Sequence, residues 1–427
     1  MNHKIPELTV GIVSAEEIKV HFNGTFEDAS GASLTGSHTF TIDSPEQDYK
    51  PVSEGATFTL RGVIIGIDFH WEQAEDQTFS GALRIARNPN KPNELYAINI
   101  VDTEEYLMSV ISSEMRGTAN MPLLKAHAVI SRSWVLAQLD TYELAKGEQL
   151  PPSDPELTWY DKEDHTIFDV CADDHCQRYQ GLTRDVTEQA REAVMSTRGE
   201  VLTADEGGLV DARFHKCCGG ILERFESCWG DTSYNYLQPV RDDAEGGLAD
   251  VSEERAAQEF ILGRPDSFCN TSDQKILEQV LNSYDQTTTD FYRWTVEYSA
   301  QELRTLLTKK SGRDLGEILA IEPILRGPSG RIYKLKIRGT EGEMIVGKEL
   351  EVRRLLSESH LYSSAFVVET KDNEQGRPTH FTLKGAGWGH GVGLCQIGAA
   401  VMGEKGYSYE EILLHYYPNT ELKKIYE

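Results

Sequence analysis

The chain has 427 residues, of which 39% are hydrophobic and 9% aromatic, so it can bury a sizeable core and is not a disordered protein. Sixty-nine acidic against forty-two basic side chains give a net charge of −27, which opposes binding to nucleic acid or to an anionic membrane. We therefore expect no nucleic-acid partner. No apolar run approaches the roughly 20 residues of a membrane-spanning helix, so we do not expect an integral membrane protein.

The N-terminal part, residues 1–100, is predicted to be rich in strands. Four segments alternate or run apolar and are separated by Gly and Asn: 8–13, 17–22, 57–65 and 83–86. The first ten residues lack the apolar segment of a signal peptide. We therefore expect a cytoplasmic protein if the chain is complete, or an exported one whose signal has been removed.

After residue 100 the apolar residues recur with a helical period. Asp102 is a good N-cap, and Glu105, three residues on, is its capping-box partner. An apolar stripe then leads to Glu114, and it consists of Tyr106, Leu107, Val110 and Ile111. Pro122 opens a second helix at its first turn. The apolar positions of that helix are Ala126, Val129, Ile130, Trp134 and Ala137.

The remaining chain mixes both kinds of element. Helices are predicted at 186–197, 348–357 and 408–416, strands at 292–298, 331–338 and 365–369, a hairpin at 199–214, a Pro-rich loop at 146–160 and a Gly-rich loop at 385–398. The acidic stretch 242–290 is interpreted as a mostly helical insertion. The predicted fold is mixed α/β, with a strand-rich core and with helices around a substrate groove.

Glu114 is the first candidate for chemistry. It ends an apolar helical face just before a Gly-containing loop, where half-burial would raise the pKa of its carboxyl toward that of a general acid. The alternative is an ordinary surface glutamate at a helix end. Lys125 and Arg132 are seven residues apart on one helix face and could hold a substrate carboxylate. The alternative is that both line the edge of the core with their alkyl stems.

The seven cysteines are an odd number and do not indicate a disulfide scaffold. Two imidazoles and two thiols within twelve residues fit a tetrahedral zinc site, and they belong to His165, Cys171, His175 and Cys176. A Cys171–Cys176 disulfide or free thiols are the alternatives. The sequence assigns no role to the other cysteines, which are Cys217, Cys218, Cys228, Cys269 and Cys395.

Blocks in the same order from about residue 100 to 425 resemble the stage II sporulation protein D family. They are Glu105 to Met115, Leu124-Lys125-Ala126, Ala128 to Arg132, Cys176-Gln177-x-Tyr179-x-Gly181, Ala193-Val194-x-x-Thr197-x-Gly199, Gly219-Gly220, Trp229-Gly230, Tyr236-Leu237, Gly387 to Gly393, Gln396-x-Gly398-Ala399 and His415 to Pro418. Only 242–290 is unlike the family's usual core. Cysteines replace the usual hydroxyl residues before Gly219 and before Gln396, which puts a hydroxyl-specific role there in doubt. A nucleophilic thiol near His215 is a minor alternative to small buried side chains.

The resemblance implies a peptidoglycan lytic transglycosylase domain over residues 100–427. Such enzymes cut peptide-stripped glycan strands between N-acetylmuramic acid and N-acetylglucosamine and leave 1,6-anhydro ends. The family's catalytic acid falls on Glu114, and the lactyl carboxylate of muramic acid would be the target of Lys125 and Arg132.

The Gly-rich loop is glycine-dense because its backbone must approach a neighbour closely or take positive φ. Trp388 and His390 would project from it into the groove and bind the glycan together with Gln396, unless they simply pack. The resemblance further implies a structural zinc at the His/Cys cluster and a place in the cell envelope. A second reading is a non-catalytic glycan-binding enhancer of a cell-wall amidase, since relatives of that kind resemble the chain too.

Overall fold

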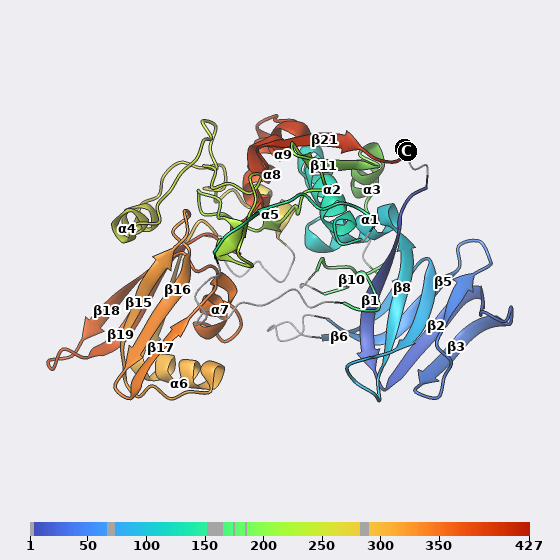
Figure 1. Cartoon of the computed structure of the whole chain (residues 1–427), viewed down its shortest axis with the longest axis horizontal. Coiled ribbons are helices and arrows are strands. Elements are labelled where there is room, and N and C mark those ends of the chain that lie inside the picture. The colour runs from blue at the N-terminus through green and yellow to red at the C-terminus, as the bar shows by residue number, and fades with distance from the viewer. Residues whose placement is uncertain are drawn as a thin grey trace. The chain divides into compact units, whose positions relative to one another are not determined.

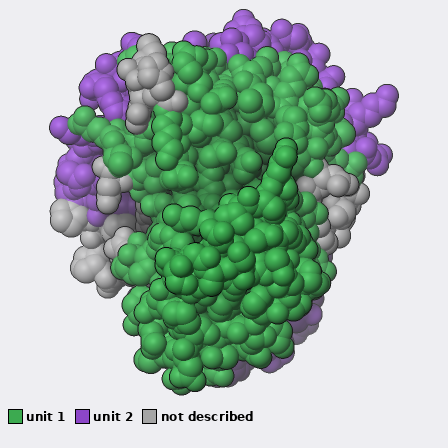
Figure 2. All heavy atoms as spheres, turned by 90° about the vertical axis from the view of Figure 1, so that its right-hand side faces the viewer, with its two compact units in different colours: residues 1–144, 163–203, 422–427 green, residues 145–162, 204–421 purple. Residues whose placement is uncertain are grey.

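The computed structural model describes residues 4–65, 73–139, 141–151, 165–173, 176–183, 186–281 and 290–427. Its fold is mixed α/β, as predicted (Figure 1). The chain forms two compact units, which Figure 2 colours separately. Unit 1 comprises residues 1–144, 163–203 and 422–427, and unit 2 comprises residues 145–162 and 204–421. This division differs from the predicted boundary at residue 100, because the helices that follow residue 102 belong to the same unit as the N-terminal strands.

Unit 1 is built on a nine-stranded sheet in the order β10-β1-β8-β7-β4-β2-β5-β6, with β3 paired to β2. Its strands are β1 (Glu7–Ala15), β2 (Glu17–Glu27), β3 (Ser33–Thr41), β4 (Gln47–Pro51), β5 (Thr57–Ile65), β6 (Gln73–Phe79), β7 (Ala82–Arg87), β8 (Leu95–Asp102) and β10 (Val170–Cys171). The N-terminal part is therefore strand-rich, as predicted. Alternation along β2 buries Ile18, Val20 and Phe22, which gives the sheet an apolar face.

Three helices complete unit 1, and Figure 1 shows them grouped at one end of the sheet: α1 (Thr103–Glu114), α2 (Met121–Leu136) and α3 (Glu188–Ser196). The predicted N-cap is confirmed, because the Asp102 carboxylate accepts the N–H of Glu105. The Glu105 carboxylate instead accepts the hydroxyl of Ser80 at 2.7 Å. Asn120 caps α2 in the same way as Asp102 caps α1. These caps fix where both helices begin.

Two of the points at which the chain changes unit, after residues 203 and 421, fall within paired strands, β11 (Glu200–Ala204) and β21 (Thr420–Lys424). The predicted hairpin at 199–214 is therefore wrong. A tight turn does follow β11, with the N–H of Gly207 donating to the carbonyl of Ala204 at 2.8 Å. The strand that pairs with β11, however, comes from the far end of the sequence.

Unit 2 combines two three-stranded sheets, β14-β19-β18 and β15-β16-β17, with short two-stranded pairs. Its strands are β9 (Glu148–Gln149), β12 (Phe214–His215), β13 (Thr232–Ser233), β14 (Arg293–Ser299), β15 (Ile318–Arg326), β16 (Ile332–Gly339), β17 (Gly342–Val346), β18 (Phe366–Asp372), β19 (Pro378–Ala386) and β20 (Leu394–Cys395). Its helices are α4 (Glu254–Leu262), α5 (Gln274–Val280), α6 (Ala300–Ser311), α7 (Glu349–Leu355), α8 (Gln396–Glu404), α9 (Tyr409–Tyr416) and the 3₁₀ helix η1 (Phe225–Ser227). The strands predicted near 292, 331 and 365 and the helices predicted near 348 and 408 are all present.

The stretch 242–290 differs from its prediction as a mostly helical insertion. In its described part, α4 and α5 span 9 and 7 residues and the chain around them is irregular. Ala257 and Ile261 of α4 pack in one buried cluster with Val367 of β18 and Ala386 of β19. The stretch thus contributes to the core of unit 2. Among the described residues, no helix combines the length and apolarity required to span a membrane.

Candidate active site

Glu114 is the last residue of α1 and is partly exposed. The buried face of α1 contains the predicted stripe of Tyr106, Leu107, Val110 and Ile111. The segment 177–180 runs along this helix, because the N–H of Gln180 donates to the Ser109 hydroxyl at 3.1 Å. In the same segment, the backbone N–H of Arg178 donates to Oε1 of Glu114 at 3.0 Å. The carboxyl is thus oriented by a backbone donor.

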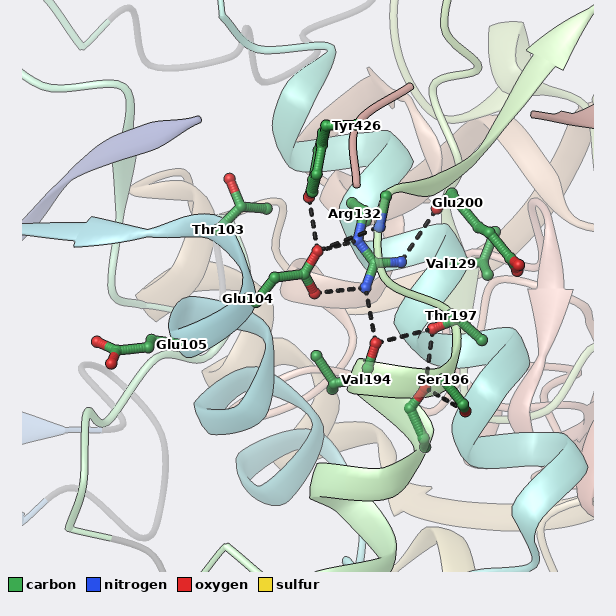
Figure 3. A network of polar contacts seen from close by, with 12 residues as sticks. Thr103, Glu104, Glu105, Val129, Arg132, Val194, Ser196, Thr197, Glu200 and Tyr426 are labelled. Carbon is green, nitrogen blue, oxygen red and sulfur yellow. Dashed lines mark hydrogen bonds and ion pairs between the residues drawn. The ribbon is translucent and has the colours of Figure 1, made fainter. Parts of the chain in front are cut away.

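Arg132 does not lie where a substrate could reach it, and its prediction as a substrate-binding residue is wrong. Its side chain has no exposed surface and forms a bidentate ion pair with Glu104, whose side chain is 4% exposed. The nitrogen–oxygen distances are 3.1 Å for Nε and 2.6 Å for Nη2 (Figure 3). Further N–H groups of Arg132 donate to the carbonyls of Val194 and Glu200. The N–H donors of the guanidinium therefore bind groups of the protein and link α2 to α1, α3 and β11.

Glu104 was missed by the sequence reasoning, although it precedes the residue named as capping partner. It also accepts the hydroxyl of Tyr426 at 2.7 Å and the N–H of Gly199 at 3.3 Å. Figure 3 shows this network at the meeting of α1, α2 and the C-terminal segment. A glutamate and an arginine that share no helix give no local signal of pairing. Lys125 lies on α2 as well but is partly exposed, and it remains a candidate ligand for a substrate carboxylate.

Three of the four predicted zinc ligands lie together in unit 1. His165 Nε2, Cys171 Sγ and Cys176 Sγ are all within 4.8 Å of one another, and His165 Nε2 is 3.4 Å from Cys176 Sγ. The fourth, His175, lies outside the described residues. All seven cysteines are described and none is in a disulfide. One imidazole and two thiols at this separation suit the donor set of zinc.

The His/Cys cluster is anchored to the sheet and leads directly to the segment that holds Glu114. Residue Cys171 belongs to β10, which pairs in parallel with β1, so that Gly11 lies opposite Cys171. Cys176 is only two residues before Arg178, whose N–H orients Glu114. A metal bound at the cluster would brace this segment without touching the reacting bond.

The Gly-rich loop lies in unit 2, and its backbone behaves as predicted. Gly387, Gly389, Gly391 and Gly393 all take positive φ, between +73° and +95°. A Cβ added to Gly393 would lie 2.0 Å from the carbonyl oxygen of Arg213. Glycine is therefore required here both for conformation and for close approach.

The aromatic residues of this loop are partly exposed and packed against neighbours. The ring of Trp388 stacks on Phe291 with centroids 4.8 Å apart and meets Tyr362 edge-on at 5.0 Å. The ring of His390 meets Trp229 edge-on at 4.8 Å. One face of Trp388 is covered by Phe291, so a sugar would have to use what remains exposed.

Two histidines meet at this loop with opposite hydrogen-bonding roles. His390 Nδ1 accepts the N–H of Val392 at 3.0 Å, whereas His215 Nδ1 donates to the Val392 carbonyl at 3.1 Å. Burial lowers the pKa of His390 well below its usual value, and the nearby His215 adds to the effect. Burial likewise lowers the pKa of His215 to about 3, helped by Arg331. Both rings are therefore neutral at physiological pH.

Gln396 is only 2% exposed at the first turn of α8. Its prediction as a glycan-binding residue is therefore wrong, because the side chain has almost no surface to offer. Two cavities in the described part of unit 2 have volumes of about 520 and 450 Å³. The first is lined by Arg264, Arg293, Trp294, Tyr362 and Lys384, among others, and the second by Arg224, Glu226, Asp231, Tyr333 and Lys348, among others. Neither is lined by a residue that the sequence assigned to the site.

Two family models match the chain. Residues 91–203 match the family described as Stage II sporulation protein, and residues 223–393 match a domain of unknown function (DUF8618). The first match contains Glu114, Lys125 and the His/Cys cluster, and the second contains Trp388 and His390.

Curated relatives agree with the first match. The amidase enhancer of Bacillus subtilis (strain 168) is 26% identical over 336 residues, which cover 74% of this chain and 40% of that protein. Stage II sporulation protein D of Bacillus amyloliquefaciens is 24% identical over 334 residues, and that of Bacillus subtilis (strain 168) is 23% identical over 333 residues. Each of these alignments covers 77% of this chain and 76% of the relative. The chain thus spans less than half of the amidase enhancer. The family match and these relatives together confirm the resemblance seen in the sequence.

Proposed function

We propose, from the match of residues 91–203 to the Stage II sporulation protein family, that the protein is a lytic transglycosylase of peptidoglycan. The observation that carries the proposal is Glu114 itself. Its partly exposed carboxyl ends α1 inside the matched segment and is oriented by the N–H of Arg178. A carboxyl held in one direction can transfer a proton to a glycosidic oxygen placed against it.

One carboxyl can serve as both acid and base in this reaction. Glu114 protonates the glycosidic oxygen while the bond from C1 of muramic acid to that oxygen breaks, and the bonding electron pair leaves with the oxygen. The resulting carboxylate takes the proton of the sugar's own 6-hydroxyl, and O6 forms the new bond to C1. Glu114 regains its proton and no water is consumed. A glycosidase that uses water needs a second carboxylate.

Other residues of unit 1 support this role. The partly exposed Lys125 would bind the lactyl carboxylate of muramic acid as a point charge. Zinc held by His165, Cys171 and Cys176 would fix the loop that leads to Arg178 and so the direction of the Glu114 carboxyl. The substrate would be peptide-stripped glycan strands, cut at the bond between N-acetylmuramic acid and N-acetylglucosamine. Such a substrate would place the protein in the cell envelope.

A second function is a non-catalytic glycan-binding protein that enhances a cell-wall amidase. The observation that favours it is the relative named amidase enhancer, which is 26% identical to this chain. In that case Glu114 would contribute to binding alone, and its loss would leave the action on the amidase in place.

The two functions are separated by incubating the purified chain with peptide-free glycan strands and analysing the products by mass spectrometry. We expect anhydromuramyl ends, and we expect Glu114→Gln to form them at least about 100-fold more slowly, as for loss of a general acid–base group. Glu105→Gln is the matched control, because Glu105 is exposed on the same helix and should leave the rate unchanged. Strands that bind to the chain without forming anhydro ends would refute the transglycosylase. In that case a separate assay on peptide-bearing peptidoglycan, in which the chain speeds peptide release by an added amidase, would support the enhancer.

A further inference from the structure

Three cysteines and one aspartate from four separate segments meet in the interior of unit 2. Cys218 follows β12, Asp242 precedes α4, Cys269 lies between α4 and α5, and Cys395 ends β20. One ligand atom from each lies within 4.8 Å of the other three, and all four side chains are buried. The Sγ atoms of Cys218 and Cys269 are 3.4 Å apart. This cluster is separate from the His/Cys cluster, which belongs to unit 1.

These separations suit a tetrahedral metal site. Zinc–sulfur bonds of about 2.3 Å and zinc–oxygen bonds of about 2.0 Å place neighbouring ligand atoms about 3.5 to 3.8 Å apart. Thiolates select zinc or iron–sulfur clusters over magnesium and calcium, and a carboxylate oxygen belongs to the usual donor set of zinc. Four protein ligands leave no position for a substrate, which is the arrangement of a structural site.

Backbone N–H groups point at two of the sulfur atoms of the cluster, those of Cys218 and Cys395. Cys395 is the N-cap of α8, and its Sγ accepts the N–H of Gly398 at 3.4 Å and that of Cys218 at 3.3 Å. Cys218 Sγ accepts the N–H of Gly220 at 3.3 Å. Such N–H donors and the positive end of a helix stabilise negative charge on sulfur. The fully buried Arg331, which donates to the Cys218 carbonyl at 3.1 Å, adds a positive charge nearby.

Asp242 is held as metal-binding carboxylates usually are, by hydrogen bonds from a second layer. The hydroxyl of Tyr416 donates to Oδ1 at 2.6 Å, and the hydroxyl of Ser267 and the N–H of Cys269 donate to Oδ2 at 2.9 and 2.8 Å. Within the described part of the chain, one basic side chain lies within ion-pair distance, that of His415 with Nε2 4.0 Å away, and burial lowers the pKa of this imidazole. A fully buried carboxylate calls for a closer positive charge, and a bound cation would supply it.

We propose that Cys218, Asp242, Cys269 and Cys395 bind one zinc ion in a closed structural site. The ion joins four segments that are far apart in the sequence. It also supports the contact between the Gly219-Gly220 turn and the Gly-rich loop.

The segment that leads to the Gly219-Gly220 turn lies directly against the Gly-rich loop. Backbone lies on backbone, because a Cβ added to Gly387 would be 2.7 Å from the carbonyl oxygen of Cys217. Trp388 is bonded to Cys217 through both backbone groups, at 2.7 and 2.9 Å. The proposed zinc therefore fixes the backbone from which Trp388 and His390 project.

The first test is the zinc content of the purified full chain, measured by mass spectrometry of the elements. Cys269→Ser should contain one zinc fewer per chain than the unaltered protein. Cys228→Ser is the matched control, because Cys228 is a buried cysteine of unit 2 outside the cluster and its loss should leave the zinc content unchanged. An unchanged zinc content in Cys269→Ser would overturn the proposal. A Cys218–Cys269 disulfide in the unreduced protein would do the same.

A second test leaves the cluster intact and so does not depend on whether Cys269→Ser folds. Cys171→Ser removes a donor of the unit 1 cluster, and the zinc that remains is studied by X-ray absorption. We expect three sulfur neighbours at about 2.3 Å and one oxygen at about 2.0 Å. Absence of zinc, or a shell of four sulfurs or mainly nitrogen, contradicts the site. Iron with acid-labile sulfide contradicts the assignment to zinc.

Discussion

The buried ion pair between Glu104 and Arg132 makes a quantitative prediction. Glu104→Gln keeps the size of the side chain but removes the charge that faces the guanidinium. Arg132 has no exposed surface, so water cannot replace the lost carboxylate. Breaking one side of a buried pair costs about 3 to 5 kcal/mol, because the remaining charge stays buried without compensation. The Tyr426 hydroxyl and the Gly199 N–H also lose a charged acceptor.

Hydrogen exchange measured on peptides of α1 and α2 is the appropriate assay, because the chain has two units and a single unfolding free energy would mix them. A loss of about 3 to 5 kcal/mol corresponds to a fall of about 100-fold to several thousand-fold in the protection of the slowest amides. Glu105→Gln, one residue along on the exposed side of α1, should change protection by no more than about twofold.

A second variant separates the charge from the packing. Adding Arg132→Met to Glu104→Gln removes the uncompensated cation and should restore most of the protection, since an apolar replacement of a buried pair is often neutral. If Glu104→Gln alone keeps the protection of α1 within about threefold of the unaltered chain, the pair does not hold the helices together. Our account of Arg132 would then be wrong.

Two further predictions concern unit 2. Burial holds the pKa of His215 at about 3, below the unfolded value of about 6.5. The neutral His215 therefore makes its full contribution to the free energy of unfolding above pH 6.5. That contribution is lost as the pH falls toward 3, by up to about 1.4 kcal/mol per pH unit. His215→Asn should flatten this acid decline in Tm, and identical declines would contradict the assignment. Gly393→Ala should lower Tm more than Gly406→Ala, because only the first places its Cβ against backbone, 2.0 Å from the carbonyl oxygen of Arg213. In the control, Gly406→Ala, the only cost is that of placing alanine in the left-handed conformation, about 1 to 2 kcal/mol. An equal loss of Tm at both positions would contradict the close approach at Gly393.

The helices around Glu114 could be predicted because their signals are local. Asp102 and Asn120 supply caps within three residues of the N–H groups they accept, and the apolar stripe of α1 repeats within one helix. The same holds for the positive φ of the Gly-rich loop. The capping box of Ser299 and Glu302 at the start of α6 was an equally local signal that the sequence reasoning passed over.

What escaped prediction depends on contacts between distant parts of the chain. Helical period placed Arg132 on the same face as Lys125, but α3 and the C-terminal segment, which bury Arg132, are not visible from α2 alone. Gln396 was likewise assigned to the site by a motif, whereas its burial depends on the packing of α8. The Cys218, Asp242, Cys269 and Cys395 cluster has spacings of 24, 27 and 126 residues, which match no metal-binding pattern in a sequence.

The hydroxyl of Tyr426 on Glu104 has a consequence for synthesis of the chain. Residues 204–421 separate the main body of unit 1 from its last segment, so the ribosome must complete unit 2 before Tyr426 exists. At about 5 to 20 residues per second this interval is roughly 10 to 40 s. During that time the nascent unit 1 lacks β21 alongside β11 and one donor to its buried carboxylate. A chaperone that binds unpaired strand edges could act in this interval, which ends once β21 pairs with β11.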